Sequence, residues 1–331
     1  MNIVIPDKIN LPNSTIDAVS KLGNFSHYQD TKNKSQDIIL RIKDADIITA
    51  NFIDITKKII TKSPKLRYII SPASGYDWID IKSATTNGVK VLNCPTHNSN
   101  AVAEHAIGLL FSVTRMISSA NNSILNGQYN SAQFTGTELG GKLLVTYGYG
   151  RVGKKIIQLA KGLNMKTAFI NSSTSKKETS ILLKQADFLV MCLPLNQKTQ
   201  NILGQEQLDL MKKTAYIINV ARGLVVDQNA LFKALKNKKI AGAGIDTFPQ
   251  DETIIKPNQN INRFTSLSNV VATPHIAYNT AEASDRLGQE LLNVSKSCLE
   301  HNPINVVNYP FNPPLLPISL IRHIIHRVNL L

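Results

Sequence analysis

The sequence is poor in cysteine, and its few cysteines stand far apart. Its 331 residues include only Cys94, Cys192 and Cys298, with no CxxC pair and no metal-ligand spacing. This usage is typical of a reducing compartment, and it predicts neither a structural disulfide nor a metal site. The cytoplasm is therefore the expected location.

Long apolar runs are also missing. No stretch approaches the roughly 20 uninterrupted apolar residues of a membrane-spanning helix. The N-terminal residues MNIVIPDKIN lack the basic and apolar regions of a secretory signal. Apolar residues make up 43% of the chain and charged residues 18%. We expect a globular protein without a membrane span, long enough to form two domains.

Acidic residues are fewer than basic residues. The chain has 37 Lys and Arg residues against 23 Asp and Glu residues, which gives a net charge of +14. The lysines form no long tract, and aromatic residues are not interleaved with them, so we interpret the surplus as a surface bias without a nucleic-acid partner. A positive field would favour an anionic substrate.

Apolar runs alternate with segments of helical periodicity along most of the chain, which predicts α/β architecture with parallel sheets. The predicted strands are 2–5, 45–49, 66–70, 89–92, 143–147, 167–170, 187–193, 215–219, 241–246 and 270–273. The shorter predicted helices are 15–22, 56–60, 205–211 and 228–235. Two longer helices are expected, one over some 25 positions from a cap at Asn98 or Ser99 and one at 281–300.

One stretch joins a strand, a glycine-rich turn and a helix. The apolar run at 143–147 leads directly into the sequence GYGRVG, an amphipathic segment follows, and a second strand begins near Thr167. The first glycine permits a sharp turn, the second lets the backbone approach a diphosphate, and the third lets the helix pack on the strand. This context predicts a dinucleotide-binding βαβ unit. Its predicted cofactor-binding residues are Gly148, Gly150, Arg151, Val152 and Gly153.

Three later strands end in polar residues. Arg222 lies in NVARG, Asp246 in GAGIDTF and His275 in TPHI. Ligands bind at the carboxyl ends of the strands of an open parallel sheet, so these side chains can converge on one site. An arginine offers a bidentate partner for a carboxylate, and a histidine is an acid near neutral pH.

Together these motifs resemble the D-isomer-specific 2-hydroxyacid dehydrogenase family, of the phosphoglycerate or glyoxylate-hydroxypyruvate reductase type, from residue 44 to about residue 308. Further matches are SGYDWID at 74–80, Asn98 with AVAEH at 101–105, and Leu193-Pro194-Leu195 with Thr199. The resemblance implies reversible hydride transfer between NAD(P) and a small 2-keto acid. It also implies a cleft between two domains and, usually, a homodimer.

The resemblance further implies two doubly wound parallel-sheet domains. A Rossmann cofactor domain at 99–283 would be inserted in a flavodoxin-like substrate domain formed by 1–98 and 284–331. Arg222 would anchor the substrate carboxylate together with backbone N–H groups of Ala73, Ser74 and Gly75. His275 would be the acid and base, and Asp246 would face the nicotinamide. The remaining cofactor contacts would come from Pro194, Thr199 and Ala221.

Two positions depart from the family pattern. The glutamate that orients the histidine in the family corresponds in register to Asp251, with Glu252 next to it, so either can be the partner of His275. The acidic residue that binds the cofactor ribose is replaced by Asn171, followed by Ser172. The change removes repulsion against a 2′-phosphate, so NAD, NADP or both can be the cofactor.

The substrate and the tail leave alternatives open. Phosphoglycerate-type members tend to carry an arginine where this chain has Ala50 and Asn51, so glyoxylate, hydroxypyruvate or pyruvate is expected before a 3-phosphoglycerate-type substrate. The altered acidic position allows a second function, a catalytically weak, dinucleotide-sensing dimer that binds a partner. The predicted tail helix at 318–331 fits a core or an interface, or alternatively a membrane surface.

Overall fold

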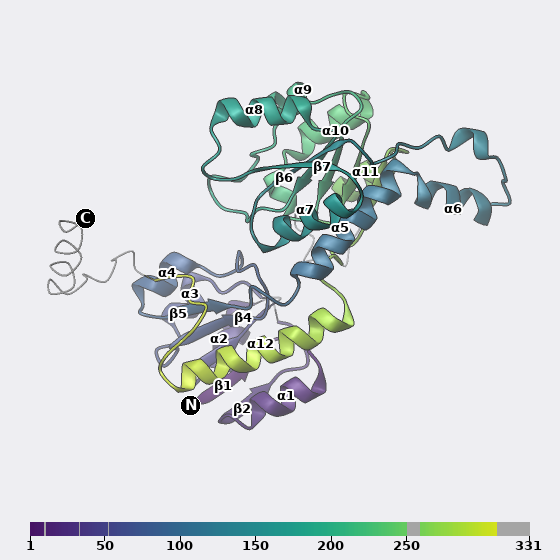
Figure 1. Cartoon of the computed structure of the whole chain (residues 1–331). Helices are drawn as coiled ribbons and strands as arrows, with labels where there is room; N and C mark the ends of the chain where they lie inside the picture. The colour runs from purple at the N-terminus through teal and green to yellow at the C-terminus, as the bar shows by residue number, and fades with distance from the viewer. Residues whose placement is uncertain (10, 33, 52, 250–258, 310–331) are drawn as a thin grey trace, which may run out of the picture. The chain divides into compact units, whose positions relative to one another are not determined.

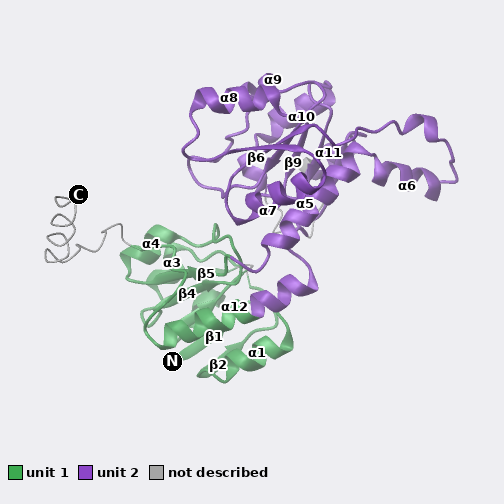
Figure 2. Cartoon of the chain, in the orientation of Figure 1, with its two compact units in different colours: residues 1–95, 289–331 green, residues 96–288 purple. Residues whose placement is uncertain are grey.

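The chain folds into two compact units. A computed structural model describes residues 1–9, 11–32, 34–51, 53–249 and 259–309. Residues 1–95 and the segment from Gln289 form the first unit, and residues 96–288 form the second (Figure 2). The sequence placed the divisions at 98/99 and 283/284, and the predicted tail helix lies outside the described residues.

The first unit contains a parallel sheet with the strand order β2-β1-β3-β4-β5 (Figure 1). Its strands are β1 (Asn2–Ile5), β2 (Asn24–His27), β3 (Ile47–Thr49), β4 (Tyr68–Ser71) and β5 (Lys90–Asn93). Its helices are α1 (Asn13–Ser20), α2 (Ser35–Ile42), α3 (Lys57–Thr61) and α4 (Ile81–Thr86), with α12 (Ala281–Leu299) entering from the second unit. This order is the flavodoxin-like one.

Burial explains which of these strands the sequence predicted. Every residue of β3 and β4 is buried, so both strands read as apolar runs. The sequence did not predict β2, because it is an edge strand whose residues alternate between exposed and half-buried and include Asn, Ser and His.

The second unit contains a parallel sheet with the strand order β11-β10-β9-β8-β6-β7. Its strands are β6 (Leu143–Tyr147), β7 (Lys166–Ile170), β8 (Phe188–Met191), β9 (Tyr216–Asn219), β10 (Gly242–Ile245) and β11 (Val270–Ala272). The chain moves from β6 to β7 on one side and then returns to β8 on the other side of β6. Doubly wound sheets bind ligands where the order reverses in this way. The predicted class, two doubly wound parallel-sheet domains, is confirmed.

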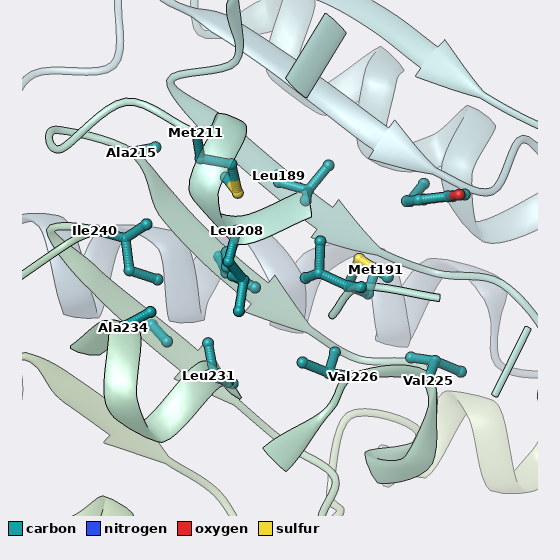
Figure 3. Packing of buried hydrophobic residues seen from close by; sticks show 14 of the residues in the cluster. Leu189, Met191, Leu208, Met211, Ala215, Val225, Val226, Leu231, Ala234 and Ile240 are labelled. Atoms are coloured by element: carbon teal, nitrogen blue, oxygen red, sulfur yellow. The ribbon is translucent and has the colours of Figure 1, made fainter. Parts of the chain in front are cut away.

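Helices cover both faces of the second sheet. The helices of this unit are α5 (Ser99–Thr114), α6 (Ile117–Leu125), α7 (Arg151–Gly162), α8 (Lys176–Gln185), α9 (Gln205–Leu210), α10 (Gln228–Lys236) and α11 (Gln259–Thr265), with 3-10 turns η1 (Ser131–Gln133) and η2 (Gly223–Val225), and all of them except α6 and η1 lie close to the sheet. Leu189 and Met191 of β8 point into one buried cluster (Figure 3), and Phe188 and Val190 point into the other. Because both faces of β8 are buried, this strand is apolar throughout rather than alternating.

The single long helix predicted from Asn98 is two helices, so that prediction was wrong. α5 ends at Thr114, Met116 is left-handed with φ +52°, and α6 starts at Ile117. The carbonyl of Thr114 accepts a hydrogen bond from the N–H of Thr137 at 2.9 Å. A continuous helix would use that carbonyl for the residue four positions on, so a contact distant in sequence ends the helix.

Candidate functional site

Each of the three glycines in the turn between β6 and α7 has a different structural role. Gly148 has φ +116°, a conformation that side chains with a Cβ rarely adopt. A Cβ on Gly153 would lie 2.3 Å from the Gly148 carbonyl oxygen, so only glycine allows this helix to pack so closely. A Cβ on Gly150 would meet no atom within 4 Å, so open space lies above the middle of the turn. This arrangement fits a diphosphate against the backbone.

The start of α7 favours an anion. Gly150 is its N-cap and makes no side-chain cap, so the first N–H groups, at Arg151 and Val152, lack partners within the helix. The helix dipole adds partial positive charge at this end. The neighbouring Cys192 thiol donates to the Gly148 carbonyl at 3.3 Å, and burial raises its pKa to about 12. The thiol therefore stays neutral and places no negative charge beside the turn.

The loop after β7 is shaped by the side chain of Asn171. Its Oδ1 accepts from the backbone and hydroxyl of Ser173 at 2.9 and 2.7 Å, and from the backbone and hydroxyl of Thr174 at 3.1 Å each. The predicted cofactor residue therefore has a structural task in its own loop. Ser172, beside it, is exposed.

The loop after β8 is closed by a hydroxyl group. Thr199 donates to the Pro194 carbonyl at 2.6 Å and accepts from the N–H of Asn196 at 2.8 Å. Pro194 is exposed and Thr199 is half-buried. Both predicted cofactor residues thus belong to one small turn at the carboxyl end of β8, which adjoins β6.

Three adjacent strands end in register beside this region. Asn219 at the end of β9 pairs with Ile245 of β10, and Ile245 pairs with Ala272 of β11. Arg222, Asp246 and His275 follow these ends directly, so the three loops that carry them leave neighbouring strands at one edge of the sheet. The sequence predicted these three strand ends, and the convergence of the side chains on one site stays a prediction.

The Arg222 loop is held by its own strand. The Asn219 side chain accepts from the N–H of Ala221 at 3.1 Å and donates to the carbonyl of Arg222 at 3.1 Å, while Arg222 Nη1 donates to the Ala221 carbonyl at 3.0 Å. A Cβ on Gly223 would lie 2.3 Å from the backbone of Phe248. These contacts explain why asparagine and glycine flank the motif.

His275 lies in a turn with an unusual backbone. Its φ is +52°, the left-handed region that costs a residue with a Cβ on the order of 1–3 kcal/mol. Its N–H donates to the Asp246 carbonyl at 2.8 Å, and its ring packs edge-on against Tyr278 with centroids 5.8 Å apart. The surrounding bonds must offset this strain.

The carboxylate of Asp246 supplies several of those bonds. It accepts from the Thr273 hydroxyl at 2.5 Å and from the N–H groups of Ile276 and Ala277 at 3.0 and 3.1 Å. Burial alone would raise its pKa, but the hydrogen bonds from His105, Thr273 and the two N–H groups outweigh burial and lower the pKa. Asp246 is only 1% exposed, and its predicted contact with the nicotinamide stays a prediction.

Sequence reasoning assigned no role to His105 or Thr273. His105 Nε2 on α5 lies 3.1 Å from Thr273 Oγ1 and 3.3 Å from Asp246 Oδ1. The available signal was a histidine in a helix whose other inward residues are small or apolar, including Val102, Ala106 and Leu109. A polar side chain in such a place needs a partner.

The loop predicted to bind the substrate carboxylate follows β4 in the first unit. Its carbonyl groups are engaged: Ala73 accepts from the N–H of Cys94 at 3.0 Å, Ser74 from the Asn93 amide at 2.8 Å, and Gly75 from the Ser71 hydroxyl at 2.7 Å. The N–H groups of Ala73 and Gly75 donate to no group among the described residues. The predicted role of these N–H groups stays a prediction.

Two acidic residues are the predicted alternatives for the partner of His275. Asp251 and Glu252 both lie outside the described residues, so the partner of His275 stays open. Within the described ranges, no three His, Cys, Asp or Glu side chains group as a metal site. No helix in those ranges has the length and apolar character needed to cross a membrane.

Known proteins resemble this chain over most of its length. The family model described as "D-isomer specific 2-hydroxyacid dehydrogenase, NAD binding domain" matches residues 107–277. A glyoxylate reductase of Pyrococcus furiosus is 36% identical over 270 residues, covering 76% of this chain and 79% of that protein. A D-3-phosphoglycerate dehydrogenase of Methanocaldococcus jannaschii is 34% identical over 291 residues, covering 83% of this chain but 54% of that protein, so the chain spans about half its length.

A solved structure extends the similarity to the whole fold. An acyclic imino acid reductase in complex with NADPH and D-Arg is 33% identical and superposes with a TM-score of 0.85. The superposition covers 93% of this chain and 100% of that one. The strand orders of both units therefore belong to a fold known to hold such a cofactor.

The buried carboxylate predicts a pH-dependent stability difference. We expect Asp246→Asn to lower the free energy of unfolding by about 1.5–3 kcal/mol at pH 7, since an amide accepts fewer hydrogen bonds and carries no charge. The folded pKa of Asp246 lies below its ordinary value of 3.8. The stabilisation is therefore fully present above about pH 4 and is lost as the pH falls through the folded value. Urea unfolding between pH 7 and pH 3 measures the difference.

The matched control is Asp285→Asn, at an exposed aspartate on α12. It should change stability little at any pH. A constant difference between wild type and Asp246→Asn over the whole range would contradict an ionised, hydrogen-bonded Asp246.

Proposed function

The chain belongs to the D-isomer specific 2-hydroxyacid dehydrogenase family, a family of NAD(P)-dependent oxidoreductases, and from that premise we propose how its own residues work. His275 is the acid that protonates the alkoxide formed when a 2-keto acid is reduced. It takes the proton back when a 2-hydroxy acid is oxidised. Arg222 binds the substrate carboxylate. When bound, the nicotinamide supplies or accepts the hydride.

One observation carries this proposal: the turn that holds His275 in a left-handed conformation leaves the sheet edge next to the Asp246 and Arg222 loops. Strained backbone persists only where surrounding bonds hold it, and such residues cluster at functional sites. A histidine has the right unperturbed pKa for proton transfer near neutral pH. Asp251 or Glu252 is the proposed carboxylate that orients the imidazole.

The proposed substrate is a small 2-keto acid without a phosphate group. A related protein is named glyoxylate reductase, and no arginine stands at Ala50 or Asn51. The N–H groups of the 73–75 loop are proposed as further ligands of the substrate carboxylate. Because the similar solved structure is an imino acid reductase, an imine formed from a keto acid and an amine is a second candidate electrophile.

We propose that both NADPH and NADH serve as cofactors. Asn171 carries no negative charge to repel a 2′-phosphate, and the Ser173 and Thr174 hydroxyls lie within its hydrogen-bonding reach. Lys176 and Lys177 follow at the start of α8 and add positive charge. No carboxylate at the end of β7 selects the 2′-hydroxyl form.

We propose that a second copy of the chain covers the arm, which consists of α6 and the segment that follows it as far as η1. Figure 1 shows α6 and the segment after it reaching away from the sheet of the second unit. Ile124 is 54% exposed, Leu125 75% and Tyr129 91%, and Ser123 is the one buried residue of α6. Apolar side chains gathered on a projecting element are typical of an interaction surface.

The cytoplasm is the proposed location. None of the three cysteines, all of which lie in the described ranges, forms a disulfide, and Cys94 and Cys298 are buried. Cysteines without disulfides are the usual state in a reducing compartment.

Turnover with NADH and with NADPH tests the reaction. We expect oxidation of at least one cofactor by glyoxylate, hydroxypyruvate or pyruvate, and a loss of roughly 10²- to 10⁴-fold in kcat for His275→Ala, because general acid catalysis contributes on that order. Initial rates at 340 nm are measured with each keto acid alone and with methylamine added. The exposed His301→Ala is the matched control and should leave kcat unchanged.

Each outcome of this assay has a distinct meaning. A rate that appears only with methylamine would support imine reduction. Cofactor binding without turnover on any substrate would overturn the dehydrogenase proposal and favour the dinucleotide-sensing dimer.

Asn171→Asp tests cofactor choice with little structural change. An aspartate keeps the Oδ1 acceptor used by Ser173 and Thr174, so chiefly the charge changes. We expect kcat/KM for NADPH to fall at least about tenfold relative to NADH, because a carboxylate repels the 2′-phosphate. Steady-state kinetics with both cofactors give the ratio.

The control is Asn196→Asp, which adds a charge to the loop after β8, where Asn196 Oδ1 also accepts backbone bonds. It should change kcat/KM for the two cofactors alike. An unchanged ratio in Asn171→Asp would place the adenosine ribose elsewhere.

Glutamate substitutions on the arm test whether it forms the proposed dimer interface. We expect the double variant Ile124→Glu with Leu125→Glu to be a monomer in light scattering coupled to gel filtration, because burying two carboxylates in an apolar interface is strongly unfavourable. Ile181→Glu, at an exposed apolar residue on α8, is the control and should stay dimeric. A double variant with the mass of the wild type would exclude the arm as the interface.

A further inference from the structure

We infer that His105 is a positioning residue for the turn that carries His275, and that it acts through Thr273 and Asp246. The inference rests on the proposed function, since that gives His275 the role of acid and base. His105 itself lies on the long helix α5, outside every loop at the sheet edge.

The distances among Thr273, Asp246 and His105 show that His105 is a hydrogen-bond donor in this network. Thr273 Oγ1 lies 2.5 Å from Asp246 Oδ1, and an ionised carboxylate has no hydrogen to give, so the one hydroxyl hydrogen lies in that bond. His105 Nε2 lies 3.1 Å from the same hydroxyl oxygen and 3.3 Å from Asp246 Oδ1. Both of these neighbours can only accept from it. His105 therefore carries a hydrogen on Nε2 and donates it.

The network forms hydrogen bonds with residues of the turn on both sides of His275. Thr273 precedes the histidine, and Ile276 and Ala277 follow it and donate their N–H groups to the Asp246 carboxylate. The His275 N–H donates to the backbone carbonyl of Asp246. A shift of the Asp246 carboxylate would therefore move the backbone immediately before and after His275.

Helix α5 gives this network a fixed anchor. Leu109, one turn beyond His105, is 3% exposed, and its Cβ would lie 3.0 Å from a Cβ on Gly244 of β10. The helix therefore packs directly on β10, the strand that ends one residue before Asp246. His105 joins this packed pair to the loop after β11, and a small displacement of a catalytic group lowers the rate of the chemical step.

His105→Leu and His105→Gln separate the hydrogen bond from packing. Leucine fills similar space without a donor, whereas the glutamine Nε2 lies as many bonds from Cα as the histidine Nε2. We expect His105→Leu to lower kcat by roughly 10- to 100-fold with the KM for NAD(P)H unchanged, and His105→Gln to recover most of the loss. The exposed neighbour Glu104→Gln is the control and should match the wild type.

Hydrogen exchange gives a readout that does not need turnover. In the full-length protein with its cofactor, the peptide containing Ile276 and Ala277 should exchange about tenfold faster in His105→Leu than in wild type, and at the wild-type rate in His105→Gln. Where the leucine variant does not fold, His105→Asn replaces it, because its amide is one carbon shorter and does not reach Thr273.

The kcat measurement and the hydrogen-exchange measurement distinguish failure of the proposed function from failure of this inference. Wild-type protein without turnover on any substrate would overturn the proposed function, while faster exchange of the turn in His105→Leu would still support the positioning role. A folded His105→Leu or His105→Asn protein with wild-type exchange at 276–277 would overturn the inference, as would equal kcat values in the leucine and glutamine variants.

Discussion

The second unit depends on the register of β9, β10 and β11. Because Asn219, Ile245 and Ala272 end level with one another, three loops leave the sheet side by side. The inner strands β8, β9 and β10 are buried on both faces by apolar clusters, so their polar neighbours lie at the strand ends. The reversal of strand order between β6 and β8 adds the glycine turn to the same carboxyl edge. The site is thus a consequence of the sheet, and its loops add the chemistry.

A buried charge stabilises the turn at this edge that contains the left-handed residue His275. Asp246 would be unstable as an isolated carboxylate at 1% exposure, yet its pKa is lowered because donors surround it. Those donors come from the turn around His275 and from α5. The charge and the left-handed residue therefore stabilise each other. The carboxylate accepts from two N–H groups that point inward, and in the turn that presents them His275 has positive φ.

The sequence was informative where local pattern and burial coincide. All the strands it predicted lie within two residues of the observed ones, because buried parallel strands are continuous apolar runs. It failed where a distant contact decides the outcome. The end of α5 depends on a hydrogen bond from Thr137, and the edge strand β2 has no apolar face to reveal it. Motif residues such as Arg222 could be predicted, but the partners of His105 could not, since 168 residues separate it from Thr273.

Asn171 shows how such a fold separates structure from specificity. Four hydrogen bonds to its Oδ1 shape the loop after β7, and that oxygen is present in asparagine and aspartate alike. The atom on the other branch of the side chain is the only difference, and it decides whether the loop carries a negative charge. If Asn171 contacts the cofactor ribose as proposed, cofactor preference can therefore change without a change in the loop. As a positioning residue, His105 is the opposite case, because the one hydrogen bond that it donates both holds the turn and places His275. Loss of that donor alters geometry and reactivity together, whereas a glutamine that keeps it alters both little.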